Sequence, residues 1–456
     1  MQQLALSART VLAYAAPALG CGYMYLLVSL YVMKYSTDVL LIPPAVMGAI
    51  FSASRIINAI SDPLIGHISD RTRSAFGRRR FWLLASVLPT AVLFYMIFIQ
   101  PRSLDANGLV IWMAVAIVGY YIAINFCFIP HLSLGAELSS DTHQRNRLFG
   151  HRHAGYTFGS VLALFTLQIF LTAEQAGPEA VRAAGGTIAI AAGIGFGALV
   201  LFAAVTLHER PEYSGTVQTP FFAAFVHVWR NPHARVLLIV TFIENVGFAA
   251  VTVLALYITE YVVGQPLMSV LVILAYMAPS AIFAPLWARV AKRVGKVHLW
   301  MYSMLTTALA FGGLFPVLYF DGPHQLPGLM TLLFIAGLAA GCGGAIGPSV
   351  QSDVIDYDEL QTGERKEGTY FAAWDFVFKS AYGVMLLLTG FILQAANFVP
   401  NATQPQSARV AMILLFSVFP LVCYLIGAWI FAKFTLDEKA HADILLRMGK
   451  PASVVD

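Results

Sequence analysis

The sequence has 456 residues, of which 58% are hydrophobic and only 11% are charged, and its mean hydropathy is +0.72. Because soluble proteins carry roughly a quarter of their residues as charged ones, this composition excludes a water-soluble fold. The formal net charge of +4 does not indicate a nucleic-acid partner, since the basic residues gather in short loops between apolar segments.

About twelve apolar runs are long enough to cross a bilayer, for which a helix needs about twenty mostly apolar residues. They are expected near residues 10–35, 46–68, 81–100, 109–129, 150–171, 188–207, 236–262, 269–290, 299–320, 329–347, 371–395 and 410–431. The first run follows Met1 to Arg9 directly, and no cleavable signal is visible. The sequence therefore predicts an all-α membrane protein with twelve transmembrane helices.

The loops alternate in charge along the chain. Those after the even-numbered runs carry Arg71, Arg73, Arg78, Arg79, Arg80, Arg145, Arg147, Arg210, Arg230, Lys292, Arg293, Lys296, Arg365, Lys366, Lys433 and Lys439. Loops on the other side carry little beyond Arg102 and Arg182. Because basic loops stay on the cytoplasmic side, this pattern predicts that both termini are cytoplasmic.

The longest polar break falls near the midpoint and contains Pro211, Pro220 and Pro232. It predicts an N-terminal six-helix bundle over 1–207, a cytoplasmic linker over 208–235, a C-terminal six-helix bundle over 236–433 and a cytoplasmic tail over 434–456. An internal repeat supports two related halves. Pro63-Leu64 returns as Pro285-Leu286 (285 − 63 = 222), and Gly77-Arg78 returns as Gly295-Lys296 (295 − 77 = 218).

The second apolar run carries a polar stripe. Arg55, Asn58, Asp62 and Gly66 recur at intervals of three and four residues, which places them on one face of a helix. That face is expected to point into protein or water, because a charge facing lipid is costly. Either these side chains neutralise groups between helices, or Asp62 has a coupling or gating role.

The segment from Gly66 to Arg73, followed by Gly77 to Arg80, resembles the loop between the second and third helices of the major facilitator superfamily. In that superfamily an acidic residue at a helix end meets the basic loop and latches one conformation. The resemblance therefore implies a gating role for Asp70, Arg71 and Arg78.

Further segments resemble the glycoside–pentoside–hexuronide:cation symporters, the group that includes the melibiose permease. They are Tyr35-Ser36-Thr37-Asp38-Val39, Ser61-Asp62-Pro63-Leu64-Ile65-Gly66, Ile129-Pro130, Leu134-Gly135-Ala136-Glu137-Leu138, Ser352-Asp353-Val354-Ile355-Asp356-Tyr357 and Glu367-Gly368-Thr369-Tyr370 with Trp374 and Lys379. The resemblance implies the major facilitator fold and a secondary transporter that moves a sugar, glycoside or sugar acid by alternating access. A site near the bilayer midplane, between the two halves, is expected.

Several positions depart from the melibiose permease. Asn58 and Phe128 stand where that family carries aspartates, Cys21 or Gly22 where an acidic residue contacts sugar, and Leu132 where a tryptophan stacks on sugar. Asp62 with Asn58 is the expected cation-coupling group. One surviving carboxylate suits a proton better than sodium, so H⁺ is the expected coupling ion.

Two basic residues match positions in the family's central cavity. Arg152 is expected either to bind substrate with its guanidinium or to anchor its helix at the membrane surface. Lys379 lies four residues after Asp375, so it either faces the cavity, with Asp62 as its cross-helix partner, or forms a self-contained ion pair. The other predicted substrate-binding residues are Trp374, Tyr120 and Asn125, although the aromatic ones equally suit packing.

Glu244 is an acidic residue within the seventh run that the family motifs do not require. It is either a second protonatable coupling site or a satisfied buried group.

The sequence contains no phosphate-binding glycine loop with its lysine, no metal-ligand cluster and no nucleophile–base arrangement. It therefore predicts no enzymatic activity and no cofactor. The expected partners are a small polar substrate, such as an anionic sugar of the hexuronide type, and the lipid bilayer, with the chain acting as a monomer in the bacterial inner membrane. A lysolipid carrier of the same fold and a non-transporting membrane sensor are the alternatives.

Overall fold

The computed structural model describes residues 6–138, 142–209, 226, 228–363 and 366–448. These residues contain no strand, and twelve of their helical stretches are long and apolar enough to cross a membrane. The predicted all-α fold with twelve transmembrane helices is therefore confirmed.

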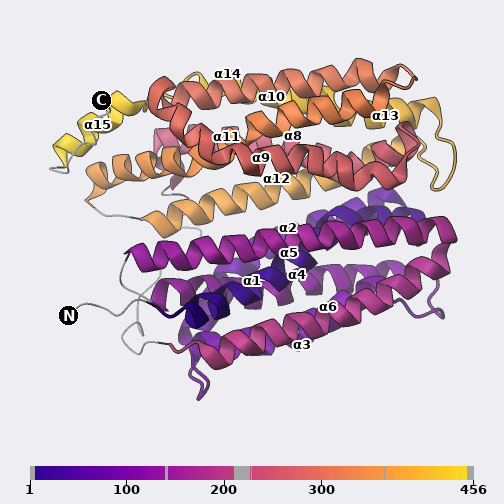
Figure 1. The fold of residues 1–456 in the computed structure, drawn as a ribbon, viewed down its shortest axis with the longest axis horizontal. Helices are drawn as coiled ribbons and strands as arrows, with labels where there is room; N and C mark the ends of the chain where they lie inside the picture. The colour runs from indigo at the N-terminus through magenta and orange to yellow at the C-terminus, as the bar shows by residue number, and fades with distance from the viewer. Residues whose placement is uncertain (1–5, 139–141, 210–225, 227, 364–365, 449–456) are drawn as a thin grey trace. The chain divides into compact units, whose positions relative to one another are not determined.

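The chain divides into two compact units, residues Met1–Gln218 and Thr219–Asp456. Unit 1 contains six long helices (Figure 1). They are α1 (Ala8–Lys34, continued by the π-helical turn η1, Tyr35–Val39), α2 (Pro44–Arg71), α3 (Arg78–Phe98), α4 (Ala106–Leu138), α5 (Thr142–Ala176) and α6 (Pro178–Thr206). Within the predicted linker 208–235, residues 210–225 and 227 lie outside the described residues.

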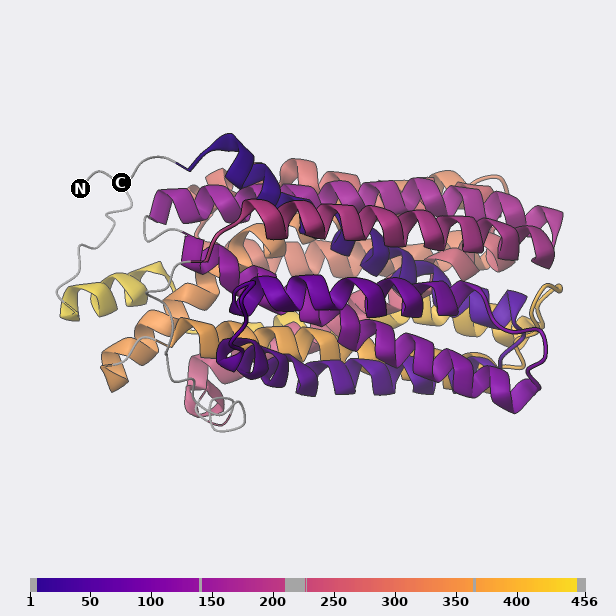
Figure 2. The same cartoon turned by 90° about the horizontal axis from the view of Figure 1, so that it is seen from below.

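Unit 2 begins its membrane-spanning part with α8 (Pro232–Tyr257), which continues as the π-helical turn η3 (Ile258–Val262). The short 3₁₀ turn η4 (Pro266–Met268) leads into the next helix. The remaining helices are α9 (Ser269–Val294), α10 (Lys296–Tyr319), α11 (Gln325–Thr362), α12 (Glu367–Ala395), α13 (Gln406–Phe416), α14 (Val418–Phe431) and the short α15 (Glu438–Arg447) in the predicted tail. Within each unit the axes of the helices, apart from α15, are roughly aligned (Figure 2).

Several helices differ in extent from the apolar runs. Helices α4 and α11 continue through Pro130 and Pro348 into polar sequence. The apolar run indicates only the part of a helix that lies in lipid, and backbone hydrogen bonding can extend the helix beyond it. The twelfth run is broken at Ser417 into α13 and α14. Pro420 lies three residues later and cannot donate the hydrogen bond that would continue the helix, which accounts for the break.

The helix packing repeats between the units. In unit 1, α1 packs on α5 and α6, and α4 packs on α2 and α3, while α3 also packs on α6. In unit 2 the equivalent contacts join α8 to α12 and α14, α11 to α9 and α10, and α10 to α14. The two units therefore share one topology, as the internal sequence repeat indicated.

Glycines allow the closest of these contacts. A Cβ atom on Gly22 of α1 would lie 2.1 Å from the backbone oxygen of Tyr156 on α5, and one on Gly159 would lie 1.9 Å from that of Leu19. Small residues at such crossings bring helix backbones together, which favours association within a membrane. The side chains of α1 are thereby held against those of α5.

Candidate functional site

The polar stripe of α2 begins with a buried arginine. Arg55 is only 2% exposed, and its guanidinium donates hydrogen bonds to Tyr25 Oη (2.5 Å), Ser29 Oγ (3.1 Å) and Tyr121 Oη (2.9 Å). It also lies 4.3 Å from the centre of the Tyr121 ring. The side chain therefore connects α1, α2 and α4 through hydroxyl groups and a cation–π contact.

The next residues of the stripe form a cluster with α4. The Asn125 side-chain amide donates to both Asn58 Oδ1 and Asp62 Oδ1. Asn58 is fully buried, and its own Nδ2 has no hydrogen-bond partner among the described residues. Asn125, predicted to bind substrate, thus lies with the two residues predicted for cation coupling.

Arg152 of α5 contacts α4 about one helical turn beyond this cluster. Its guanidinium is 4.6 Å from the centre of the Phe128 ring, and Phe128 follows Asn125 by three residues. The Nε and one Nη of Arg152 are buried without a hydrogen-bond partner in the described part of the chain. Tyr156 lies close enough to interact with both Arg55 and Arg152. Unit 1 thus gathers two guanidinium groups, the amide–carboxylate cluster and several rings.

Tyr120, another predicted substrate-binding residue, is fully buried. Its ring packs against Phe94 at a centroid distance of 5.8 Å and against Tyr121 at 5.3 Å. These contacts are those of a packing residue. Binding of substrate by Tyr120 stays a prediction.

The predicted residues of unit 2 lie on α12 and α8. Lys379 forms an ion pair of 2.7 Å with Asp375, the local pair that the sequence offered as an alternative. Trp374 is 4% exposed and packs on Tyr370, while its indole nitrogen has no hydrogen-bond partner among the described residues. Glu244 lies on α8 and is half-buried.

At the predicted gate, the acidic residue at the end of α2 meets the basic loop through Arg79. Asp70 pairs with Arg79, and Arg79 also contacts Glu137 of α4 at 3.1 Å. Arg78 forms an ion pair of 2.9 Å with the same Glu137. Arg71 is exposed. Arg79 and Glu137 are therefore the centre of this network, although neither was selected from the sequence.

A glutamate caps the helix that follows each of the repeated glycines. Gly77 and Gly295 have φ angles of 93° and 89°, a region that favours glycine. Glu209 accepts hydrogen bonds from the backbone N–H groups of Arg78, Arg79 and Arg80 at 2.9, 2.9 and 2.8 Å. Glu438 accepts one from the backbone of Lys296. These carboxylates satisfy free N–H groups and the positive end of each helix dipole.

Unit 2 has its own charge network at this end. Lys296 pairs with Asp353 of α11, and His441 of α15 lies 3.5 Å from Asp353 and 2.9 Å from Asp356. Lys296 aligns with Arg78 in the repeat, and Asp353 follows Glu137 by a similar offset (353 − 137 = 216). The sequence repeat was the signal that could have identified this second pair.

Among the described residues, no group of three or more His, Cys, Asp or Glu side chains is arranged to hold a metal ion. The polar cluster at Asp62 contains one carboxylate and two amides.

The chain is similar to bacterial symporters and carriers along nearly its whole length. The inner membrane symporter YicJ of Escherichia coli (strain K12) is 26% identical over 409 residues, covering 89% of this chain and 87% of the relative. The isoprimeverose transporter of Lactiplantibacillus pentosus is 25% identical over 453 residues, covering 97% and 92%. The glucuronide carrier protein homolog of Escherichia coli (strain K12) is 21% identical over 451 residues, covering 98% and 97%.

Solved structures share the fold. A D-xylose-proton symporter matches with a TM-score of 0.69 at 16% identity, covering 98% of this chain and 99% of that one. The nucleoside transporter NupG matches with a TM-score of 0.65 at 14% identity, covering 94% and 100%. The family model described as MFS/sugar transport protein matches residues 13–438. Because this match spans most of the sequence, the chain belongs to the MFS/sugar transport protein family and is a membrane transporter, not an enzyme.

Proposed function

We propose that this protein is a symporter that moves a sugar, glycoside or sugar acid together with a proton by alternating access. Relatives named as symporters and sugar carriers support the class of substrate. The observation that carries the proposal is the cluster of Asn58, Asp62 and Asn125, buried across α2 and α4 beside the guanidinium of Arg152. Placing such a cluster inside a membrane-spanning bundle costs free energy, so its presence indicates a functional site.

Arg152 is the proposed substrate-binding group. Two of its nitrogens are buried without a hydrogen-bond partner among the described residues. A planar guanidinium can donate two parallel hydrogen bonds to a carboxylate or to neighbouring hydroxyls. Phe128 and Tyr156 offer ring faces beside it. Buried guanidinium nitrogens without a hydrogen-bond partner in the described part of the chain favour an anionic sugar, such as a hexuronide, as the substrate.

Asp62 is the proposed coupling group, and H⁺ the proposed ion. Hard metal cations prefer several oxygen ligands in a fixed cage, whereas a proton needs only one carboxylate. Asp62 accepts a hydrogen bond from the side-chain amide of Asn125, which also donates to Asn58. Proton binding changes the charge of this cluster, and a change of charge can favour one transporter conformation over another.

Substrate class is testable with purified protein. Thermal-shift measurements with sugar acids, neutral sugars and lysolipids identify ligands, and flux into proteoliposomes tests transport of each hit. We expect a hexuronide to raise the melting temperature and to enter vesicles when a proton gradient is imposed. Stabilisation by lysolipid alone would instead indicate a carrier of amphiphiles, and binding without any flux would indicate a sensor.

We infer from the basic loops that both termini face the cytoplasm. The four native cysteines are buried, so introduced cysteines can be labelled selectively. Ser103→Cys, in the loop before α4, is expected to react with an impermeant maleimide added to intact cells. Ala75→Cys, in the loop between α2 and α3, is expected to react only after the membrane is opened. The reverse pattern would contradict this orientation.

A further inference from the structure

Glu244 lies about halfway along the membrane-spanning stretch Pro232–Val262, on the central helix of unit 2. The helix that carries it, α8, packs against α12 and α14, with further contacts to α9 and α11. The carboxyl group is therefore inside the bundle at a depth where water is scarce. The proposed symport mechanism through Asp62 in unit 1 makes no use of it.

The surroundings of Glu244 come from four other helices. The side chain of Trp300 of α10 lies close enough to interact with the carboxyl group. Tyr276 of α9, Cys342 of α11 and Tyr424 of α14 lie close enough to interact with it electrostatically. A Cβ atom on Gly427 would lie 3.5 Å from Glu244 Cγ. Side chains from these four helices thus surround a single carboxyl group.

None of these neighbours carries a positive charge. The titratable groups that face Glu244 are Tyr276, Cys342 and Tyr424, and Tyr382 of α12 lies beside the two tyrosines. Within the described part of the chain, Glu244 forms no ion pair with Lys, Arg or His. An unpaired carboxylate is poorly tolerated inside a membrane-spanning bundle, whereas a hydrogen-bonded carboxylic acid is accommodated.

We propose that Glu244 is a second proton-binding site, in which the carboxylate takes up one proton and is held as a neutral carboxylic acid among the aromatic side chains of unit 2. Glu244 is half-buried, so its side chain is not fully enclosed by protein. Its role as a coupling site rests on the proposed proton symport, but proton binding itself does not depend on any substrate.

Infrared spectroscopy of the reconstituted protein without substrate tests the proposal directly. The carbonyl band of a protonated carboxylic acid is separate from the bands of a carboxylate. At pH 7, the spectrum of wild type minus Glu244→Gln is expected to contain the protonated-acid band. Glu179→Gln provides a matched control, since the Glu179 side chain is 77% exposed and paired with Arg102. Its difference spectrum is expected to contain carboxylate bands only. Carboxylate bands in the Glu244→Gln difference would overturn the proposal.

A second measurement needs no substitution, in case Glu244→Gln does not fold. Dicyclohexylcarbodiimide is an apolar reagent that adds to protonated carboxyl groups within membranes, and mass spectrometry locates the adduct. We expect the adduct on Glu244 at pH 7, decreasing as the pH is raised, and none on Glu179. Adducts on other carboxyl groups of the spans with none on Glu244 would overturn the proposal. Neither measurement involves sugar, so its failure is distinguishable from failure of the proposed transport function.

Discussion

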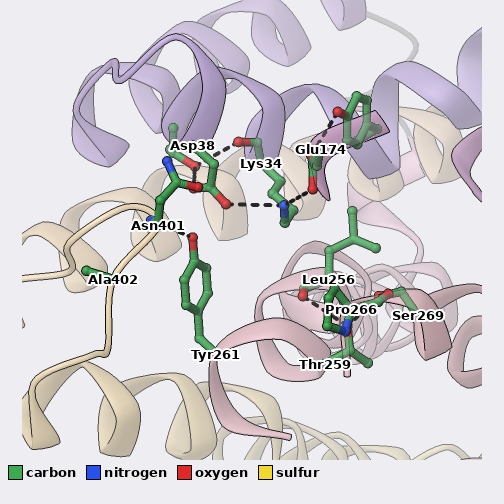
Figure 3. Close-up of polar contacts among 12 residues, drawn as sticks. Lys34, Asp38, Glu174, Leu256, Thr259, Tyr261, Pro266, Ser269, Asn401 and Ala402 are labelled. Carbon is green, nitrogen blue, oxygen red and sulfur yellow. Dashed lines mark hydrogen bonds and ion pairs between the residues drawn. The ribbon is translucent and has the colours of Figure 1, made fainter. Parts of the chain in front are cut away.

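Lys34 at the end of α1 lies between two acidic side chains, with its Nζ 2.6 Å from Glu174 of α5 and 3.3 Å from Asp38 of η1 (Figure 3). Tyr31 also donates its hydroxyl to Glu174, at 2.8 Å. The side chains of Lys34 and Asp38 are 1% and 2% exposed. A buried ammonium thus contacts carboxylates from two elements and joins the end of α1 to α5.

Replacing Lys34 with Met is expected to destabilise the protein strongly. Removing one member of a buried charge cluster leaves the others without compensation, at a cost of about 3–5 kcal/mol. The matched control is Arg102→Met, because Arg102 and Glu179 form an ion pair whose side chains are 73% and 77% exposed. Pairs of that kind contribute roughly 0–1 kcal/mol. Melting temperatures in detergent provide the comparison, and equal shifts in the two variants would contradict the prediction.

Arg152→Lys is expected to weaken substrate binding about tenfold or more, although the charge is kept. The loss of one charge-assisted hydrogen bond costs about 1.5–3 kcal/mol, and an ammonium cannot reproduce the planar pair of donors. Arg147→Lys, on the same helix, is the control, since Arg147 is exposed and donates only to the backbone of Leu6 in the described structure. Ligand titration followed by tryptophan fluorescence or calorimetry measures both. Unchanged affinity in Arg152→Lys would make Arg152 an anchoring residue.

Loss of charge at Asp70 or Arg79 is expected to change the transport rate more than the affinity for substrate. Arg79 pairs with both Asp70 and Glu137, and this network is expected to stabilise one conformation. A bias of about 1–3 kcal/mol shifts such an equilibrium roughly 5–150-fold. The exposed Arg71 is expected to tolerate Arg71→Gln with little change in rate. Initial rates and half-saturation concentrations in proteoliposomes distinguish the cases. Large losses of affinity at unchanged rate would count against a conformational role.

Asp62→Asn is expected to abolish accumulation of substrate against its gradient while downhill exchange persists. The variant keeps the shape of the cluster with Asn125 but cannot exchange a proton. Wild-type uptake is expected to follow an imposed proton gradient and to be indifferent to sodium. Sodium-driven uptake at fixed pH, or accumulation by the variant, would refute proton coupling at this residue.

His441→Ala is expected to release α15 from the end of unit 2. The ring of His441 lies between Asp353 and Asp356 of α11, and Glu438 of the same short helix caps α10. A ten-residue helix has little stability by itself, so its position depends on such contacts. Limited proteolysis is expected to cleave the C-terminal segment faster in this variant. Arg447→Gln, which removes only an exposed pair with Asp443, is expected to behave as wild type.

The sequence by itself determined the class of the protein and the location of its helices along the chain. A bilayer of a given thickness requires apolar runs of a given length, so each membrane-spanning helix can be located from its own residues. The repeat of Gly77-Arg78 as Gly295-Lys296 likewise indicated two related halves, because the same helix start is built in both.

Only the tertiary structure decided which polar groups meet. Asp70 pairs with Arg79 of α3, whereas Arg71, its neighbour in the sequence, is exposed. Lys34 meets Glu174 across 140 residues of sequence. Spacing along one helix specifies a face but not the neighbour that packs against it. The pairing of charges inside the bundle therefore follows from helix packing, which brings together side chains that the sequence keeps far apart.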